Sequence, residues 1–305
     1  MKKRNKNKLI ILLLLVLFVS TGCTKQLTDS DNNAVKNPTT GQTLTENILC
    51  KPKDKETVDL YIKNKVDVES LPTCEDFKVT SGGYEGLWTT LFVKPLAWLI
   101  LTIGEFVRNN GLALIITGLF IRLVAYPITR KTAMQSELMK KAKPELDRLE
   151  KKYADKNDNE SMMRKSQEMA LIYKKYNINP ISGCLFALLQ FPLFIGFFEA
   201  INRVPAIFEE NFLGLQLGTT PMTGVTSGSL IYIVLVVIVG LSTHFSLKFN
   251  SASNPDNEQV KSMNKVMFFM ILFMSIFMSS ALNIYWITTN LFTIGQNLLV
   301  KREKV

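Results

Sequence analysis

The sequence predicts an all-α membrane protein: a five-transmembrane-helix bundle with a polar groove, a cytoplasmic helical hairpin and an extracytoplasmic amphipathic helix. The 305-residue chain is 47% hydrophobic, and its apolar residues collect in blocks close to the ~20 residues that a bilayer-crossing helix needs. The chain has a formal net charge of +10, and many of its basic residues lie between these blocks, as the positive-inside bias of cytoplasmic loops requires. Because there is no separate basic domain, we expect no direct nucleic-acid recognition.

Residues 1–22 have the organisation of a signal peptide. The basic stretch "MKKRNKNK" precedes the apolar stretch "LIILLLLVLFV", which is short for a membrane span. The following "STGC" ends at Cys23 and resembles the lipobox of bacterial lipoproteins, although Ser20 stands where that motif usually has leucine. The resemblance implies acylation of Cys23; the alternative is an ordinary cleaved signal peptide beside a cysteine. Both place the mature N-terminus outside the cytoplasm.

Residues 23–84 follow as an extracytoplasmic, lipidated linker or a very small subdomain. The segment is polar and rich in Asn, Asp, Thr and Lys. Cys50 and Cys74 both lie in it, and disulfides persist outside the cell. The two cysteines are therefore candidates for a disulfide, with two free thiols as the alternative.

Residues 85–108 predict an amphipathic helix at the outer membrane surface. Lys94, Pro95 and Glu105 interrupt its apolar run. Trp88 and Trp98 are of the residue type that is enriched at membrane–water interfaces. A helix that lies on the outer leaflet fits this pattern better than a span.

The core, residues 109–300, holds five candidate spans at about 111–127, 182–201, 228–247, 264–283 and 284–300. The charged segment 128–180 separates the first two. Apolar residues recur in it at helical spacing on both sides of "ADKNDNE", which predicts two antiparallel helices. These positions are Met134, Leu138, Leu146, Leu149, Tyr153, Met162, Met169, Ile172, Tyr173 and Tyr176.

The distribution of charge predicts the topology. Segment 128–180 is rich in Lys and Arg, and the tail 301–305 is also basic. The loop 202–227 has only Arg203 beside Glu209 and Glu210. An extracytoplasmic N-terminus followed by five spans places the hairpin and the tail in the cytoplasm and the loop outside, as the positive-inside rule requires. A span at 85–108 would reverse every one of these assignments.

Arg122 interrupts the first span, in "GLFIRLVAYP". A charge at this depth costs roughly 2.5–3.5 kcal/mol on the insertion scale. The apolar residues around it outweigh this cost, so the helix inserts and turns Arg122 toward protein or water. The alternative is an anchor near the interface whose guanidinium reaches lipid phosphate. The other predicted spans offer no obvious carboxylate partner, which favours a wet cavity.

Polar residues of the other spans are candidates to line such a groove. In the last span they share a face, and smaller sets occur in the second and third spans. Polar side chains also join helices directly, which is the alternative for each of them. The candidates are Gln190, Ser242, Thr243, Ser246, Trp286, Asn290, Thr293 and Asn297, with Thr289 and Gln296 beside them.

Three stretches together resemble the YidC/Oxa1/Alb3 family of membrane protein insertases, in the lipoprotein form found in Gram-positive bacteria. They are "GLFIRLVAYPIT", "NPISGCLFALLQFPLFIGFF" and "IYWITTNLFTIGQ". The resemblance covers roughly residues 85–300 and implies a bacterial cell-membrane insertase whose arginine, at Arg122 here, faces a hydrophilic groove. It implies nascent membrane proteins and the lipid bilayer as partners, and leaves the Sec translocon and the ribosome open. "SSALNIYW" lacks the proline and glycine that often precede the tyrosine–tryptophan pair.

Three other classes of function compete with this expectation. A small-solute transporter usually shows internal repeats, and none is visible. An intramembrane protease needs an activated nucleophile or a metal, yet His244 is the only histidine, the predicted spans offer it no acidic partner, and no HExxH pattern occurs. A scaffold associated with the Sec translocon remains an alternative. We expect a protein that is not an enzyme and that uses no cofactor and no metal.

Overall fold

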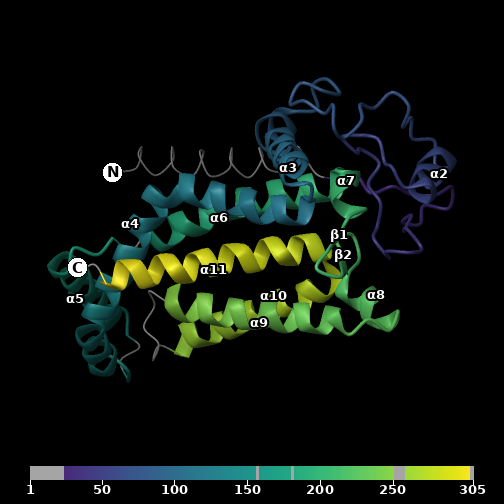
Figure 1. Ribbon diagram of the computed structural model, residues 1–305. Helices are drawn as coiled ribbons and strands as arrows, with labels where there is room; N and C mark the ends of the chain where they lie inside the picture. Colours follow the sequence, from purple (N-terminus) through teal and green to yellow (C-terminus); the bar gives the residue numbers. More distant parts are fainter. Residues whose placement is uncertain (1–23, 156–157, 180–181, 251–257, 303–305) are drawn as a thin grey trace. The chain divides into compact units, whose positions relative to one another are not determined.

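The computed structural model describes residues 24–155, 158–179, 182–250 and 258–302 (Figure 1). The predicted signal peptide 1–22, the lipidation site Cys23 and residues 303–305 of the tail lie outside the described residues. The chain divides into two compact units. The first unit comprises the described residues of 24–118, 191–236 and 275–286. The second unit comprises the described residues of 119–190, 237–274 and 287–302.

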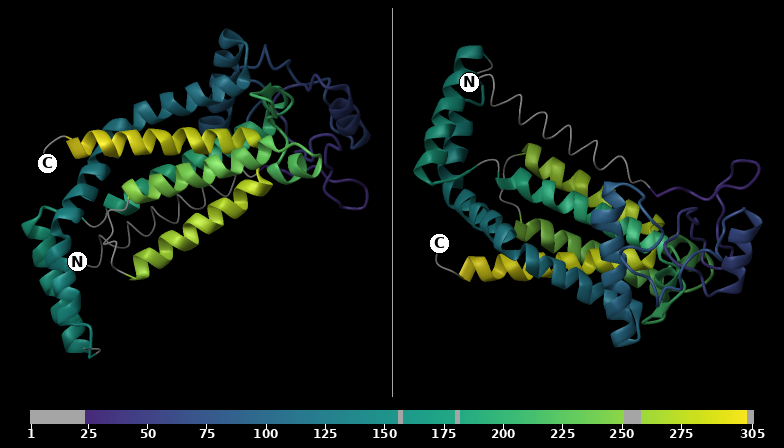
Figure 2. Two further views of the ribbon diagram at one scale, coloured as in Figure 1. Left: turned by 60° about the horizontal axis from the view of Figure 1, so that its bottom comes forward. Right: turned by 90° about the horizontal axis from the view of Figure 1, so that it is seen from above.

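The described secondary structure is almost entirely helical (Figures 1 and 2). The exceptions among the described residues are one two-stranded antiparallel sheet of β1 (Asn211–Phe212) and β2 (Leu215–Gln216) and several isolated β-bridges. A π-helical turn spans Thr89–Val93. The α-helices are α2 (Lys55–Lys63), α3 (Lys94–Val107), α4 (Asn110–Lys152), α5 (Asn159–Lys175), α6 (Ser182–Arg203), α7 (Pro205–Phe208), α8 (Pro221–Thr226), α9 (Ile231–Asn250), α10 (Glu258–Phe277) and α11 (Ser280–Arg302).

Three of the described helical segments are long and apolar enough to cross a membrane. They are Thr89–Val107, Asn110–Lys152 and Ile231–Phe249. The second and third contain predicted spans, whereas the first is the segment predicted to lie at the interface. Length and composition therefore do not by themselves separate an interfacial helix from a span. The number of five spans stays a prediction.

Residues 24–84 form a small subdomain with a core of its own, rather than an extended linker. Short bridges pair Gln26 with Thr45 and Lys36 with Thr43. The side chain of Asp54 accepts a hydrogen bond from the backbone N–H of Thr57 and so caps the N-terminus of α2. The core residues are Leu27, Leu44, Ile48, Tyr61 and Val68. Cys50 and Cys74 form a disulfide with their Cα atoms 4.9 Å apart.

The subdomain is bound to the chain between α6 and α9. Arg203, at the end of α6, donates from Nε to the carbonyl of Asn47 at 2.6 Å, and its own carbonyl accepts from the N–H of Leu49 at 2.8 Å. The carboxylate of Glu209 accepts from the N–H groups of Lys53 and Asp54 at 3.0 and 3.2 Å. Arg203 counted as a loop charge in the sequence, but it is fully buried here.

A cluster of charged side chains links the segment before α3 to Arg203 at the end of α6. Glu85 forms ion pairs with both Arg203 and Lys94. Lys94 is buried, and its Nζ also donates to the carbonyls of Ser81 and Gly83 at 2.6 Å each. Lys94, which interrupts the apolar run in the sequence, therefore presents its charge to protein acceptors and not to solvent. A buried cation needs several acceptors, and the turn at residues 81–85 supplies them.

Helix α3 meets α4 at a sharp corner. Arg108 ends α3 in the left-handed conformation, with φ 56°, and α4 starts two residues later. The N–H of Asn109 returns to the carbonyl of Gly104 at 3.1 Å. Within the first unit α3 consequently lies across the first turns of α4 and the last turns of α6 (Figures 1 and 2). The exposed apolar residues of the continuous helical segment Thr89–Val107 include Leu91 in the π-helical turn and Trp98 and Phe106 in α3.

In the second unit α4 runs on from the predicted span into the predicted hairpin. It passes through Pro127 and Pro144 without ending, although each proline removes one backbone hydrogen bond. The N-terminus of α5 is capped by Asp158, and α5 packs antiparallel on the end of α4. The shared core is built by Leu138, Met139, Ala142, Leu146, Met169, Ile172, Tyr173, Tyr176 and Ile178. Met162, one of the apolar positions in the helical spacing, is exposed.

The last two helices are divided earlier than predicted. The break falls after Phe277, at the turn before Ser280, and not between residues 283 and 284. The backbone N–H and the hydroxyl of Ser280 both donate to the carbonyl of Thr219, at 2.9 and 2.8 Å. Asn283 donates to the carbonyl of Ser275 at 2.9 Å. The turn is thus fixed by a loop that is distant in sequence, inside an otherwise continuous apolar run.

Candidate functional site

Helix α4 presents a stripe of buried polar residues in the second unit. Arg122, Thr129 and Ser136 are seven residues apart and therefore share one helix face. Their exposed fractions are 7%, 4% and 2%. The sequence analysis identified only Arg122 as a candidate. Thr129 and Ser136 could have been found from their spacing of seven and fourteen residues after Arg122. Arg122 lies in the apolar part of α4, where lipid cannot satisfy its hydrogen bonds, so that its side chain turns toward protein or water.

The predicted polar residues of α9 and α11 are brought together. The amide of Asn290 donates to the hydroxyls of Ser242 and Thr243, at 3.3 and 3.0 Å. Ser242 in turn donates to the carbonyl of Val239 at 3.0 Å. Ser246, one helical turn further, is buried on the same side of α9. Asn290 thus links α11 to α9 by side-chain hydrogen bonds, which an apolar residue at this position could not form.

Helix α11 also reaches α4. The amide of Gln296 donates to the hydroxyl of Thr129 at 2.8 Å, and Thr129 lies 3.2 Å from the carbonyls of Ala125 and Tyr126. Asn297 donates to the carbonyl of Thr293, one turn back, at 2.8 Å. Its own buried side-chain oxygen has no hydrogen-bond partner among the described residues. An oxygen in that state costs about 1–3 kcal/mol unless water or a ligand reaches it.

Trp286 and Gln190 are the two remaining predicted groove residues. Trp286 lies in the first unit, where its ring meets that of Phe194 edge to face at 5.0 Å between centroids. Gln190 lies at the end of the α6 segment of the second unit, half-buried, and its side-chain oxygen lacks a partner among the described residues. We call the set Arg122, Thr129, Ser136, Ser242, Thr243, Ser246, Asn290, Thr293, Gln296 and Asn297 the polar cluster.

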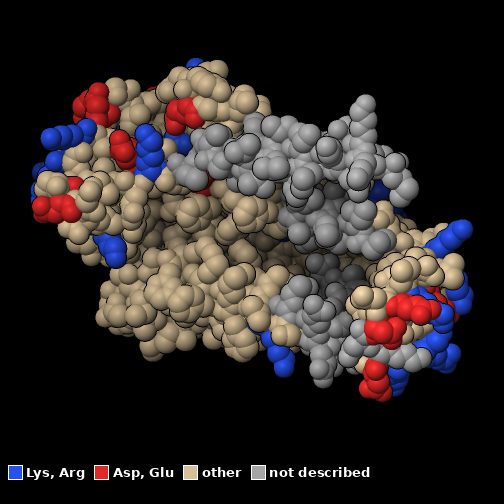
Figure 3. Space-filling model, turned by 180° about the vertical axis from the view of Figure 1, so that it is seen from behind, with Lys and Arg blue, Asp and Glu red and all other residues tan. Residues whose placement is uncertain are grey.

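The polar cluster holds one fixed charge. Helices α9 and α11 contain no Asp or Glu, so the side chains that they contribute to the polar cluster are uncharged. On the face seen in Figure 3 charged side chains gather over the subdomain and over the α4–α5 hairpin, and few lie on the described surfaces of the other helices. Among the described residues no group of three or more His, Cys, Asp or Glu side chains could hold a metal ion.

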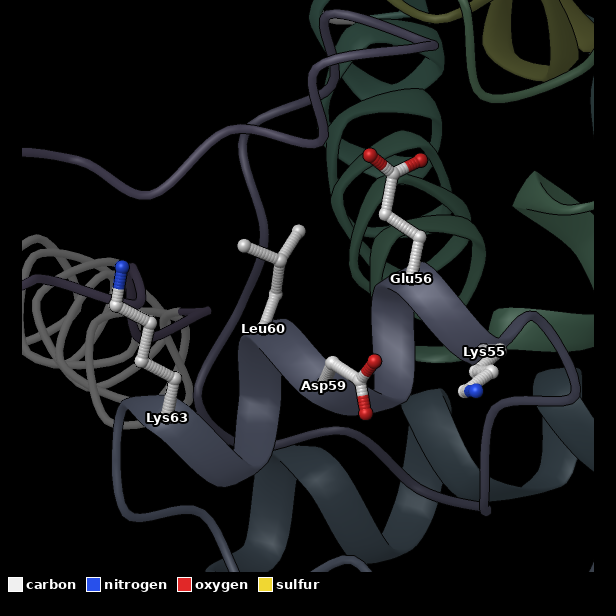
Figure 4. A pocket seen from close by; sticks show the side chains of 5 residues that line it. All are labelled: Lys55, Glu56, Asp59, Leu60 and Lys63. Atoms are coloured by element: carbon white, nitrogen blue, oxygen red, sulfur yellow. The ribbon is translucent and has the colours of Figure 1, made fainter.

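A hollow on the subdomain does not have the character of a site. It measures about 500 Å³ and is lined by one face of α2 (Figure 4). The lining residues carry charges of both signs and do not converge on a common point. They are Lys55, Glu56, Asp59, Leu60 and Lys63.

The fold and the polar cluster define a helical membrane protein with buried hydrogen-bonding groups on three of its helices. The family model of the 60Kd inner membrane protein matches residues 102–305. The membrane protein insertase YidC of Oceanobacillus iheyensis is 34% identical over 226 residues, which cover 72% of this chain and 85% of that protein. The insertase MisCA of Bacillus subtilis is 33% identical over 216 residues, 70% and 79% of the two chains. The chain belongs to the YidC/Oxa1 family of membrane protein insertases.

A solved structure of an active YidC insertase shares 19% identity with this chain, at a TM-score of 0.47. The match covers 79% of this chain and half of that one. The family match begins at residue 102, so the subdomain of residues 24–84 lies before it.

Proposed function

We propose that this chain inserts nascent membrane proteins into the bacterial cell membrane and receives their polar segments at the polar cluster. Membership of the insertase family supports the activity. The observation that carries the proposed site is the pair of buried contacts from α11, Asn290 to α9 and Gln296 to α4. These groups can exchange their partners for water or for the polar groups of an incoming chain, which lowers the cost of desolvating that chain.

Arg122 supplies the attraction in this mechanism. Acidic residues in a translocated segment are drawn to the guanidinium, and the apolar helix of the client then moves into lipid. No nucleotide-binding motif occurs in the sequence, so the hydrophobicity of the client and the membrane potential supply the free energy. The cationic hairpin of α4 and α5 receives the client or its ribosome in the cytoplasm, and the Sec translocon is a further partner.

We also propose that the mature chain begins at an acylated Cys23 and that residues 85–108 lie at the outer leaflet. The first rests on the "STGC" site. The second is supported by the corner at Arg108 and by the exposed apolar face of α3. The intact mass of the purified protein shows whether the lipid is present.

Reconstitution in lipid vesicles tests the proposed activity. The full-length protein, without Sec components, should insert a single-span client above the level of protein-free vesicles. Asn290→Leu should reduce the yield, because it removes the donor to Ser242 and Thr243. Leu291→Ala, at the exposed neighbouring position, is the matched control and should retain it. Insertion that occurs only when Sec is added would identify a scaffold instead.

A further inference from the structure

The β1–β2 hairpin in the loop between α6 and α9 has an unusual turn. Phe212 pairs with Leu215, so Leu213 and Gly214 form a two-residue turn. Both have positive φ, 52° and 80°, as a type I′ turn requires. The first of these positions favours Asn, Asp or Gly, because the Cβ of other residues crowds the backbone in this region. Leucine is thus a poor choice for the local conformation.

Packing does not account for this leucine either. Leu213 is 76% exposed. A residue that strains the turn and buries little of its own surface points to a contact outside the chain.

The hairpin lies beside the outer ends of two membrane helices. Asn109, just before α4, donates to the carbonyl of Asn211 at 3.4 Å. A Cβ on Gly214 would lie 3.3 Å from Cδ1 of Ile231, the first residue of α9. The exposed apolar surface continues from there: Leu230 is 71% exposed, and Ile233 and Val234 are exposed on the first turn of α9.

We propose that Leu213, together with Leu230, enters the outer leaflet of the bilayer at the boundary between headgroups and acyl chains. Lipid is the occupant because the same apolar surface runs onto α9, which is long and apolar enough to cross the membrane. The hairpin then fixes how deeply the outer end of α9 sits in the membrane. The proposal rests on the membrane-spanning fold and not on insertase activity.

Fluorescence quenching in vesicles tests the contact. A tryptophan at Leu213→Trp, in the full-length protein reconstituted in brominated phosphatidylcholine, should be quenched at least twofold more than one at Ile62→Trp. Ile62 is an exposed apolar residue of α2 and serves as the matched control. Iodide, a quencher confined to water, should act more strongly on the control. Quenching at position 213 by iodide alone would place it in water, and protection from both quenchers would place it against protein; either result overturns the proposal.

A second substitution separates lipid contact from a structural role. Asparagine adopts positive φ more readily than leucine or lysine. Leu213→Asn and the control Lys65→Asn, at another exposed position with φ 64°, should both raise the midpoint of thermal unfolding. In vesicles only Leu213→Asn should increase cleavage of the loop 202–227 by protease added outside. Unchanged cleavage, or a lowered unfolding midpoint for Leu213→Asn alone, would contradict the proposal.

Discussion

Arg122 is buried on a helix that is otherwise apolar around it, at one end of a stripe whose other members are hydroxyl groups. Arg122 could act through its positive charge alone, or through the planar guanidinium that binds a carboxylate with two hydrogen bonds. A clamp would need the planar fork of the guanidinium, which lysine lacks. A positive potential would be preserved by lysine. Substitutions at this residue therefore separate the two roles.

We expect Arg122→Lys to retain most activity and Arg122→Ala to lose about tenfold with a client whose translocated segment is acidic. At 10 Å and an effective dielectric constant of 20, two unit charges interact by roughly 1.7 kcal/mol, about one decade in rate. A matched client with a neutral segment should lose less. Insertion yields for both clients across the three proteins give the comparison. Equal losses would indicate a structural role, and no loss would indicate a lipid anchor.

At the residue scale, the sequence predicts which polar residues share a face of one helix. It predicts less well which residues of different helices are in contact. Ser242, Thr243 and Asn290 were all candidates, since each is polar within an apolar span, and they do meet. Thr129 was not, because one threonine near a predicted helix end resembles an ordinary boundary residue. Thr129 belongs to the cluster because Gln296, 167 residues away in the sequence, donates a hydrogen bond to its hydroxyl.

At the scale of elements, the α4–α5 hairpin is closed by two matching contacts. Near the end of α4, Lys152 and Tyr153 both bind Glu168 of α5; at the end of α5, Lys175 and Tyr176 both bind Glu145 of α4. The lysine and tyrosine donors hold the pKa of Glu145 and of Glu168 below the usual value of a glutamate. A lowered native pKa stabilises the native hairpin above the unfolded pKa, and this contribution is lost as the pH falls through the native value.

Protection of the α5 amides from hydrogen exchange should therefore decline as the pH is lowered below about 4.5. Both glutamates are partly exposed to solvent, so the decline should be modest and should shrink further in high salt. The double variant Glu145→Gln and Glu168→Gln should lose most of this dependence on pH. Glu160→Gln is the matched control, because Glu160 pairs with Arg164 of its own helix. A control that behaves like the double variant would show that the contacts between the helices are not the cause.

The sequence predicted the presence of these helices better than the positions of their ends. The hairpin followed from apolar spacing, because both helices bury one face against each other. The continuity of α4 did not follow, because Pro127 and the change from apolar to charged residues look like an end. The turn before Ser280 is set by hydrogen bonds to Thr219, which no local pattern reveals.

At the scale of the whole molecule, the proposed topology places the hairpin and the loop 202–227 on opposite sides of the membrane. A cysteine at Ser227→Cys should react with an impermeant thiol reagent in intact cells, and one at Lys151→Cys only after permeabilisation. Both positions are exposed. Cys184→Ser provides the background for both, and wild-type protein controls for other native thiols. Labelling of both positions from the same side would contradict the topology.

The attachment of the subdomain to Arg203 has a consequence for biogenesis. Asn47 and Arg203 are 156 residues apart. At about 5–20 residues per second, roughly 8–30 s separate the synthesis of the two. The subdomain is therefore made well before its attachment surface exists, and Cys50 can pair with Cys74, 24 residues later, on a chain that is still growing. In the proposed topology, a docked subdomain then marks a molecule in which the end of α6 and the following loop have already crossed the membrane.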